Sequence, residues 1–525
     1  MIPLSLLKSM KRILAIFTAL LVAQIVRAAN AQKPNIIVIL ADDLGWGDPG
    51  CQPKGEAWGE EARIATPNID ALAAGGARCT DGYATCMVCS PSRAALLAGR
   101  YQQRLGFYGF PEANAGIPKD VRLLPEALRA AGYATGMIGK WHVGFPSGQQ
   151  PLDRGFDQFF GMIGGQHDYF DARLGQPIDT VSNAADAPIM DGKKPLGKIT
   201  YLTDEFTDRA LNFMQTAAQG KKPFFLYLPY SAPHPPMQAL WKDLEPFAKK
   251  RANSRFNERD IARAMIVNLD ENVGRLLRWL RESGLEKDTL VFFTSDNGGA
   301  DDGPGHVTQH NGGLRGRKGY FYEGGIRIPY LVSWPGRIPP ATVYHQPVSH
   351  LDIYATALAV AGVTDAASLD GVNLMPFLRG EREDAPHAKL FWGMENTATR
   401  WAVREGGWKL VNEDTRPTIS QRVGKATYAT QLYHLADDPF EQHDLAKEQP
   451  GRVAALQRAM NEFQATMKPS LFTAEVAAAR TAALAERKKN PALREHPRVD
   501  GSPGHWIGAG AKERMAGEAN GSEKP

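Results

Sequence analysis

The chain has 525 residues, of which 43% are hydrophobic and 22% are charged, and its formal net charge is +4. This length and balance are typical of a globular protein with more than one domain. The net charge is small for the length, and the sequence contains no basic cluster with interleaved aromatic residues, which excludes a nucleic-acid-binding protein.

The N-terminus has the pattern of a secretory signal peptide over residues 1–31. Lys8, Lys11 and Arg12 precede an apolar stretch, and a small-residue cleavage site ends at Ala31. A membrane anchor is the alternative, but the apolar stretch is too short to span a bilayer comfortably. We therefore expect the export machinery to deliver a cleaved, soluble protein to the periplasm or the exterior, without stable membrane insertion.

An unbroken apolar run from Ile36 to Ala41 predicts a strand that is buried on both faces, as in a parallel sheet. Asp42 and Asp43 follow it directly. In open α/β sheets the ligand crevice lies beyond the carboxyl ends of the strands. Adjacent carboxylates at such a place are consistent with a bound cation, but for so short a motif taken alone a solvated acidic turn is the favoured explanation.

The segment from Cys86 to Arg100 carries a reactive-group pattern. Ser90 is a good N-cap and Pro91 suits the first helical position, so we expect a helix to begin there. Cys89 would then lie at a helix N-terminus, where free amides and the helix dipole favour an anion. Arg93 adds a guanidinium that can grip an oxyanion. The pattern predicts a reactive group beside an anion cradle.

The four cysteines, Cys51, Cys79, Cys86 and Cys89, all lie in the first fifth of the chain. Export would permit disulfides. Cys86 and Cys89 form a C-x-x-C pair, but redox and zinc chemistry are weakly supported because no second pair follows. If Cys89 is chemically special, the other three allow at most one disulfide, whose pairing is open.

The next elements place further polar residues after predicted strands. A helix is expected from Leu124 to Ala131, ended by Gly132, and a strand-like segment then leads to Lys140 and His142. Another apolar strand begins near Lys222 and runs into a proline-rich turn that carries His234. A long helix follows at 258–283, and a strand from Thr289 ends in Asp296 and Asn297.

Alternating strands and helices predict an α/β fold, with a large, mostly parallel mixed sheet sandwiched by helices. Each polar residue after a strand has an ordinary structural explanation, but their repetition favours one shared site at one edge of the sheet. The residues expected there are Asp42, Asp43, Cys89, Arg93, Lys140, His142, His234, Asp296 and Asn297.

Residues 312–329 are glycine-rich and basic, and Lys318 within them could serve an anionic substrate. From about residue 385 the pattern changes to shorter strands, at 401–411 and 431–435, and a helix at 453–467. We expect a catalytic domain over 32–384 and a smaller C-terminal α+β domain with a short antiparallel sheet over 385–470. The tail, 471–525, is expected to be helical and then mobile.

Asp42, Asp43, Asp296 and Asn297 offer only oxygen ligands, which suits a hard cation such as Ca²⁺ or Mg²⁺ better than zinc. Nearby basic residues would favour a tetrahedral oxyanion, and together they predict sulfuryl or phosphoryl transfer.

Cys89-Ser-Pro-Ser-Arg93 and the following 94–100 resemble the signature of the formylglycine-dependent (type I) sulfatases of the alkaline phosphatase-like superfamily. That family includes arylsulfatases and N-acetylgalactosamine-6-sulfatase-like enzymes. The resemblance runs from about Lys33 to Leu445, with Ala98 in place of the family's usual threonine and Cys86 as an extra cysteine. The other matching segments occur in the family's order: 42–43, 139–142, 231–234, 295–297, the Lys318 loop, 369–372 and 432–441.

The resemblance implies that a formylglycine-generating maturation enzyme oxidises Cys89 to 3-oxoalanine (Cα-formylglycine). A serine would form a stable sulfate ester, whereas a sulfated gem-diol can collapse to the aldehyde and expel sulfate. The resemblance also implies a role for each site residue. Ca²⁺, rather than Mg²⁺, would be held by Asp42, Asp43, Asp296, Asn297 and the modified residue 89. Arg93 and Lys140 would stabilise the hydrate, and sulfate would be bound by Lys140, His234 and Lys318. His142 would be the base, and His234 or Lys318 would protonate the leaving group.

We therefore expect a sulfuric ester hydrolase that acts on a sulfated small molecule or carbohydrate, such as a polysaccharide or glycosaminoglycan fragment. Aromatic residues at 106–110 and 166–170 could line a sugar site or simply pack. The alternatives are a phosphonate monoester or phosphodiester hydrolase of the same superfamily, and a non-catalytic exported binding protein in which Cys89 stays a thiol.

Overall fold

The computed structural model describes residues 33–53, 64–109, 116–170, 172, 188–248, 258–300, 309–364, 368–394, 399–415 and 426–471. The expected signal peptide and the expected tail beyond residue 471 lie outside these residues.

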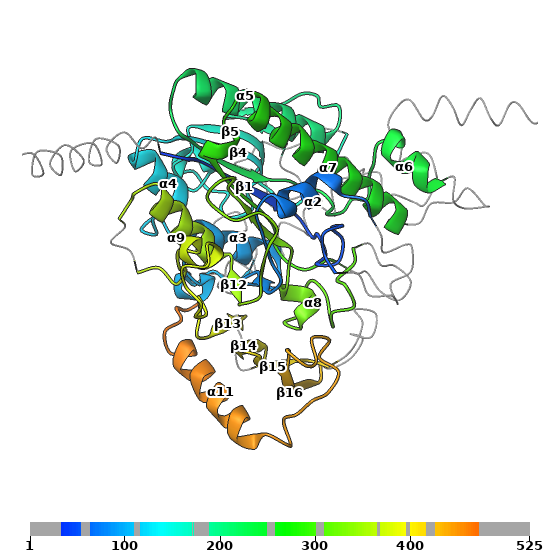
Figure 1. Ribbon diagram of the computed structural model, residues 1–525, viewed down its shortest axis with the longest axis vertical. Coiled ribbons are helices and arrows are strands. Elements are labelled where there is room, and N and C mark those ends of the chain that lie inside the picture. The colour runs from blue at the N-terminus through cyan, green and yellow to red at the C-terminus, as the bar shows by residue number, and fades with distance from the viewer. Residues whose placement is uncertain are drawn as a thin grey trace, which may run out of the picture.

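A ten-stranded sheet forms the centre of the molecule (Figure 1). Its five middle strands are mutually parallel, and antiparallel neighbours flank them on both sides. In spatial order the strands are β11 (Thr342–Tyr344), β2 (Ala77–Cys79), β10 (Tyr330–Ser333), β9 (Thr289–Ser295), β1 (Asn35–Ala41), β8 (Phe224–Pro229), β4 (Ala134–Lys140), β5 (Gln158–Met162), β6 (Met190–Asp191) and β7 (Lys194–Pro195).

The central strand β1 is buried along its whole length, as its unbroken apolar run predicts. Because successive side chains point to opposite faces, Ile36 and Val38 enter one core and Ile37 and Ile39 enter the other. Both faces of the sheet are therefore covered.

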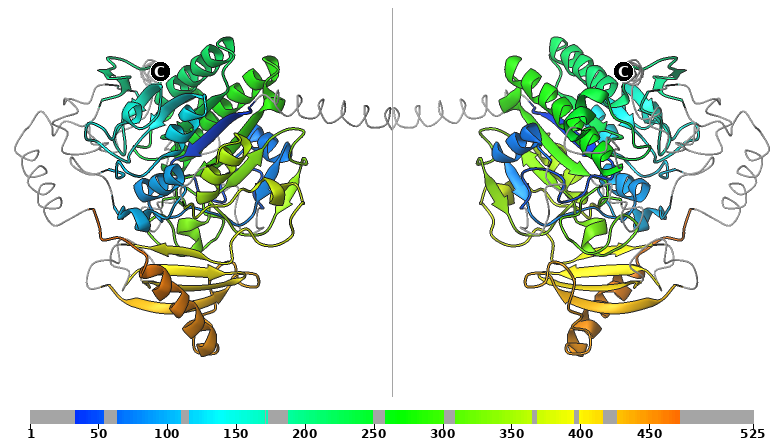
Figure 2. Two further views of the ribbon diagram at one scale, coloured as in Figure 1. Left: turned by 90° about the vertical axis from the view of Figure 1, so that its left-hand side faces the viewer. Right: turned by 90° about the vertical axis from the view of Figure 1, so that its right-hand side faces the viewer.

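Helices cover the two faces in separate groups (Figures 1 and 2). One face packs against α3 (Cys89–Ala98), α4 (Leu124–Ala130) and α9 (Leu351–Val360), and the other against α2 (Pro67–Ala74), α5 (Leu202–Gln219) and α7 (Glu258–Glu282). The predicted α/β sandwich is confirmed. The remaining elements of this part are α6 (Trp241–Ala248), α8 (Glu323–Ile326), α10 (Met375–Leu378), the parallel pair β3 (Gly82–Tyr83) and β12 (Val348–Ser349), and short 3-10 helices at 102–105, 151–153 and 286–288.

A second, four-stranded antiparallel sheet lies at one end of the molecule (Figure 2). It consists of β13 (Leu390–Gly393), β14 (Trp401–Glu405), β15 (Trp408–Asp414) and β16 (Tyr428–His434), and α11 (Pro450–Gln464) packs on it. The expected antiparallel α+β part is confirmed. The segment expected as a strand at 401–411 is the hairpin of β14 and β15, which turns at Gly406 with a φ of 56°. The expected helix starts earlier, because Pro450 suits its first turn.

The other face of this small sheet packs against the main body. Trp392 and Tyr433 share a hydrophobic cluster with Met87 and Phe321, which lie two residues before Cys89 and three residues after Lys318. The small sheet therefore supports two loops that carry predicted site residues.

Two further observations concern export and redox state. Within the described residues, no helix has the length and apolar character required to cross a bilayer. Cys51, Cys79, Cys86 and Cys89 are all free thiols, so the one disulfide that the sequence would have allowed is not formed among them.

Candidate active site

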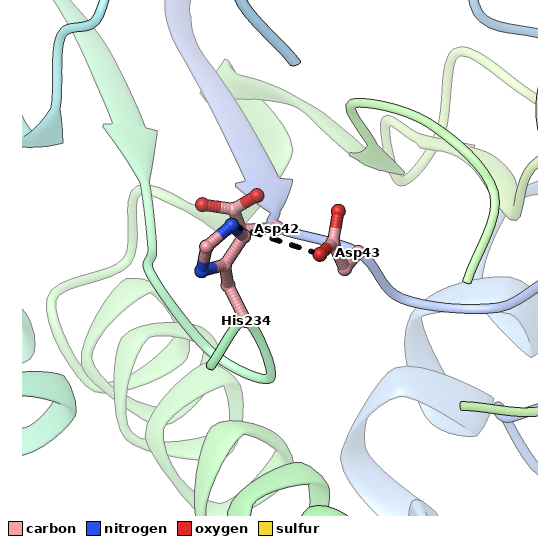
Figure 3. Close-up of side chains that lie close together, drawn as sticks. All are labelled: Asp42, Asp43 and His234. Atoms are coloured by element: carbon pink, nitrogen blue, oxygen red, sulfur yellow. Dashed lines mark ion pairs between the residues drawn. The ribbon is translucent and has the colours of Figure 1, made fainter. Parts of the chain in front are cut away.

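The carboxyl ends of the parallel strands bring the predicted site residues together. Asp42 and Asp43 follow β1, Lys140 ends β4, and Asp296 follows β9. Figure 3 shows the ring of His234, from the loop after β8, turned toward the two carboxylates. Hydrogen bonds, ion pairs or charge interactions join the other predicted residues to this group: Cys89, Arg93, His142, Asn297 and Lys318.

Helix α3 begins at Cys89, two residues before Pro91, the first helical position that the sequence predicts. The backbone of Val88 is extended, and it becomes helical at the next residue, so Val88 occupies the N-cap position. Ser90 is not a cap, because its Oγ donates to the main-chain oxygen of His142 at 2.6 Å. The expected place of Cys89 at a helix N-terminus is retained.

Two buried cations hold the inner carboxylates. Lys140 Nζ lies 2.5 Å from Asp42 Oδ2, and Arg93 Nη2 lies 2.6 Å from Asp296 Oδ2. All four side chains are fully buried. Arg93 Nη1 also donates to the main-chain oxygen of Lys140 at 3.0 Å, which ties the start of α3 to the end of β4.

The outer carboxylate, Asp43, faces two side chains nearer the surface. Lys318 Nζ lies 2.6 Å from Asp43 Oδ1, and the amide of Asn297 donates to the same oxygen at 2.7 Å. His234 Nε2 lies 3.8 Å from Asp43 Oδ2. The side chains of Lys318 and His234 are 19% and 14% exposed, so an anion can reach these two first.

The three carboxylates differ in proton affinity. Burial, together with repulsion from Asp296, raises the pKa of Asp42 to about 7. Burial opposes ionisation of the other two as well, but the charge of Lys318 lowers the pKa of Asp43 and that of Arg93 lowers the pKa of Asp296. Asp42 is therefore the carboxylate of the three that holds its proton most tightly.

The donor set fits a hard cation. Asp42 Oδ1 and Asn297 Oδ1 are buried and accept no hydrogen bond from any described residue, although buried oxygens are normally paired. Asp42, Asp43 and His234 each offer one atom within 4.8 Å of the others. The unpaired oxygens belong to residues that the sequence predicted as metal ligands, and oxygen-rich sets suit Ca²⁺. The sequence predicts His234 at this edge of the sheet as a sulfate-binding residue and does not predict it among the metal ligands.

Cys89 and His142 form the reactive pair of the site. Cys89 Sγ lies 3.4 Å from His142 Nδ1. Burial raises the pKa of the Cys89 thiol in spite of Lys140 and Lys318, and it holds the pKa of His142 well below the usual value. Both groups are neutral near pH 7, which argues against a thiolate nucleophile.

The ring of His142 lies against Gly165, where an added Cβ would come within 2.7 Å of ring atoms. A side chain at position 165 would therefore displace the ring. His142 itself has a φ of 58°, an unusual backbone conformation for a residue with a side chain.

The loop that carries His234 is fixed from behind by Tyr169. The hydroxyl of Tyr169 lies 2.7 Å from Ser231 O and 2.9 Å from His234 O. Tyr169, Phe107 and Tyr108 are buried and pack in the interior, whereas Phe170 is half-buried. Phe110 lies outside the described residues.

The chain is similar to known proteins over most of its length. A family model described as Sulfatase matches residues 34–363, and a second, described as N-sulphoglucosamine sulphohydrolase, C-terminal, matches 316–468. The N-acetylgalactosamine-6-sulfatase of Mus musculus is 32% identical over 474 residues, which are 84% of this chain and 87% of that protein. Arylsulfatase A of Homo sapiens is 33% identical, over 85% of this chain and 90% of that protein.

Among solved structures, that of Ps i-CgsB in complex with k-i-k-neocarrahexaose superposes with a TM-score of 0.73 and 31% sequence identity. The match covers 87% of this chain and 99% of the Ps i-CgsB chain. The likeness therefore extends over both sheets.

Proposed function

The chain belongs to the sulfatase family and is a sulfuric ester hydrolase, and we propose that it removes sulfate from carbohydrate esters with a formylglycine made from Cys89 and one bound Ca²⁺. The observation that carries the proposal is the position of Cys89. It is buried as a neutral thiol at the N-terminus of α3, beside a neutral histidine and inside a cluster of carboxylates and cations.

The proposed Ca²⁺ ligands are Asp42, Asp43, Asp296 and Asn297, with the modified side chain of residue 89. The unpaired oxygens of Asp42 and Asn297 support this set. When bound, the ion would supply positive charge where negative charge develops on the sulfate oxygens. Ca²⁺ is preferred to Mg²⁺ because a crowded set of protein oxygens meets its higher coordination number.

The formylglycine would supply a hydrated aldehyde. After one of its hydroxyls has taken up the sulfate, loss of the proton from the second hydroxyl would re-form the aldehyde and expel sulfate, without attack by water at sulfur. His142 would remove the proton of that hydroxyl, since its Nδ1 faces the side chain of residue 89 and burial keeps the ring neutral. Arg93 and Lys140 hold the surrounding carboxylates and would stabilise the hydrate.

Substrate sulfate would enter between His234 and Lys318, the two partly exposed members of the site. Lys140 and Lys318 would bind the sulfate oxygens through charge-assisted hydrogen bonds, and the ring of His234 would contact the sulfate beside them. His234 or Lys318 would also return a proton to the leaving oxygen.

A sulfated carbohydrate is the proposed substrate class. Its support comes from relatives that are named for N-acetylgalactosamine 6-sulfate or solved with a neocarrahexaose. A panel of sulfated mono- and oligosaccharides, scored by released sulfate beside an aryl sulfate, a phosphodiester and a phosphonate ester, tests it. Preference for the aryl sulfate over every sugar would count against the carbohydrate.

The nucleophile is tested by co-expression with a formylglycine-generating enzyme and mass spectrometry of the peptide that contains residue 89. We expect the mass of formylglycine and its hydrate, with turnover in proportion to the modified fraction. Cys89→Ala should abolish turnover and leave the thermal transition in place, whereas Cys86→Ala is the matched control that keeps activity. Full turnover by a protein whose Cys89 is an unmodified thiol would overturn the mechanism.

Export and the domain division are part of the same proposal: a signal peptide is removed after Ala31, and a catalytic domain of 32–384 precedes the smaller domain of 385–470. N-terminal sequencing of the mature protein tests the first point. A mature chain that begins at Met1 would contradict it.

A further inference from the structure

The small C-terminal sheet contributes a buried ion pair that lies beside the candidate active site. Arg400 immediately precedes β14, and Glu413 lies near the end of β15. Arg400 Nε is 2.7 Å from Glu413 Oε1 and Nη2 is 3.0 Å from Oε2, so the pair is bidentate. The Glu413 side chain is fully buried and that of Arg400 is 19% exposed.

Both members of this pair also hold the turn that follows Lys318. Arg400 Nη2 donates to the main-chain oxygen of Gly319 at 2.5 Å, and Glu413 Oε2 accepts from the main-chain nitrogen of Phe321 at 2.9 Å. Gly319 has a φ of 88°, a conformation that glycine adopts readily. One ion pair therefore holds the backbone of the turn at two places, Gly319 and Phe321.

The same clamp reaches the loop that precedes Cys89. Gly319 N donates to Met87 O at 2.8 Å, and Arg400 Nη2 lies 3.4 Å from Met87 Sδ. Met87 is two residues before Cys89, so Arg400 joins the loop of the nucleophile to the loop of Lys318. A shift of this guanidinium would move the two loops relative to one another.

The ammonium of Lys318 pairs with Asp43 at the end of a long, flexible side chain, so the position of its backbone decides where this charge can lie. On its N-terminal side the main-chain nitrogen of Lys318 is held by Gly299 O at 3.1 Å. On its C-terminal side the described polar contacts of the turn come from Met87, Arg317, Arg400 and Glu413. The C-terminal family model, which begins at residue 316, likewise includes this turn with the small sheet.

We propose that Arg400 and Glu413 are positioning residues for Lys318, which makes the small sheet a working part of the sulfate-binding site. The inference rests on the proposed function, since it assumes that Lys318 binds the sulfate group. The ion pair acts through the backbone at 319–321 and touches neither the sulfate nor residue 89.

The test uses Arg400→Lys and Glu413→Gln in the full-length, formylglycine-containing protein, assayed with 4-nitrophenyl sulfate. Arg400→Lys keeps the charge but loses the guanidinium fork, and Glu413→Gln keeps the shape but weakens the ion pair. We expect each to lower kcat/KM about tenfold, mainly through a higher KM, because a displaced Lys318 binds sulfate less well.

Arg404→Lys is the matched control. Arg404 lies on β14, and the described hydrogen bonds of its guanidinium go to Asp81, Tyr83 and Gly406 and not to the Lys318 turn. We expect Arg404→Lys to lower the melting temperature by as much as Arg400→Lys while kcat/KM stays within about twofold of wild type.

A double-mutant comparison separates positioning from general support. In a Lys318→Ala background, Arg400→Lys and Glu413→Gln should cause no further loss of kcat/KM, because the side chain that they position is gone. The same loss in both backgrounds would overturn the inference and leave only a structural role. Lys318→Ala with full activity would instead refute the proposed sulfate-binding role of Lys318, a result that is distinct from the failure of the two outer variants.

Discussion

Ser90 Oγ donates a hydrogen bond of 2.6 Å to the main-chain oxygen of His142, the residue whose ring faces Cys89. The main-chain nitrogen of His142 in turn donates to Ile163 O at 3.0 Å. These two bonds hold His142 in its left-handed conformation, with a φ of 58°. The immediate neighbour of the proposed nucleophile therefore fixes the backbone of the proposed base.

Ser90→Ala should reduce kcat about ten- to a hundredfold with little change in KM, because a catalytic ring displaced by a fraction of an ångström acts poorly. The unpaired carbonyl should also lower the free energy of unfolding by about 1–2 kcal/mol. Steady-state kinetics and urea unfolding measure the two effects. Formylglycine content at residue 89 must be equal in both proteins, and an unchanged kcat at equal content would remove Ser90 from this role.

The affinity for Ca²⁺ should decrease as the pH is lowered, because a proton on Asp42 competes with the ion. The pKa of Asp42 in the cation-free protein is about 7, above its value of 3.8 in the unfolded chain. The folded state therefore holds this proton more tightly, and the group's contribution to stability falls as pH rises from about 4 to about 7. A cation and a proton compete for the same carboxylate, so binding of the cation is favoured at higher pH.

Calorimetric titration of metal-stripped protein with CaCl₂ should show affinity about tenfold lower at pH 6 than at pH 8. Asp42→Asn should bind Ca²⁺ weakly at both pH values and lose most of this dependence. Equal affinity of the wild-type protein at both values would show that Asp42 does not ligate the ion.

Much of this site could be predicted from the sequence, because its residues directly follow buried strands, and a buried strand can be recognised from its own run of apolar residues. The apolar run before Asp42 and the one before Asp296 reveal parallel strands, and parallel strands end at one edge. The prediction stops where a contact depends on tertiary packing. Ser90 has the composition of an N-cap, but its hydroxyl bonds to His142, and only the folded chain brings those two residues together.

The same limit applies to the C-terminal part. Its strands and helix are recognisable by pattern, yet the bond from Arg400 to Gly319 spans 81 residues and joins the small sheet to a loop of the main body. Nothing near Arg400 in the sequence indicates Lys318. For the aromatic residues at 106–110 and 166–170 the sequence pattern does not decide between two roles, because an aromatic side chain in a loop is equally suited to packing and to recognition.

A buried lysine should hold the two parts of the molecule together. Lys409 Nζ, on β15, lies 2.8 Å from Glu323 Oε1 and 2.9 Å from Glu441 Oε1, and all three side chains are fully buried. Lys409→Met leaves two carboxylates without this cation, so we expect a loss of about 3–5 kcal/mol in the free energy of unfolding. Urea denaturation measures it, and Lys389→Met, which breaks the partly exposed pair with Glu405, should cost less than about 1 kcal/mol.

The cost of Lys409→Met should also depend on pH. Burial and repulsion from Glu323 raise the pKa of Glu441 to about 7, above 4.5 in the unfolded chain. Stability from this group is therefore present at low pH and lost as pH rises through about 7. At pH 5 Glu441 is protonated and needs no cation, so the variant should be less destabilised there than at pH 8. An equal loss at both pH values would contradict this account of the cluster.

His234 and Lys318 compete for the role of proton donor to the leaving oxygen, and the hydrogen bonds of His234 favour Lys318. His234 Nδ1 lies 2.6 Å from Pro235 O, a carbonyl that can only accept, so a neutral ring has a bare Nε2. Burial and the charge of Lys318 lower the pKa of His234 to about 3, which leaves the ring neutral at working pH. Lys318 keeps its ammonium, because Asp43 raises its pKa in spite of burial.

Leaving-group dependence distinguishes the two residues. A sugar alkoxide needs a proton to depart, whereas 4-nitrophenolate does not. Loss of the proton donor should therefore lower kcat/KM mainly for sugar sulfates. We expect Lys318→Ala to lower kcat/KM for a sugar sulfate at least about a hundredfold more than for 4-nitrophenyl sulfate. His234→Ala should lower both by similar factors, because it removes sulfate binding alone. The reverse pattern, with the sugar-specific loss in His234→Ala, would assign the proton to His234.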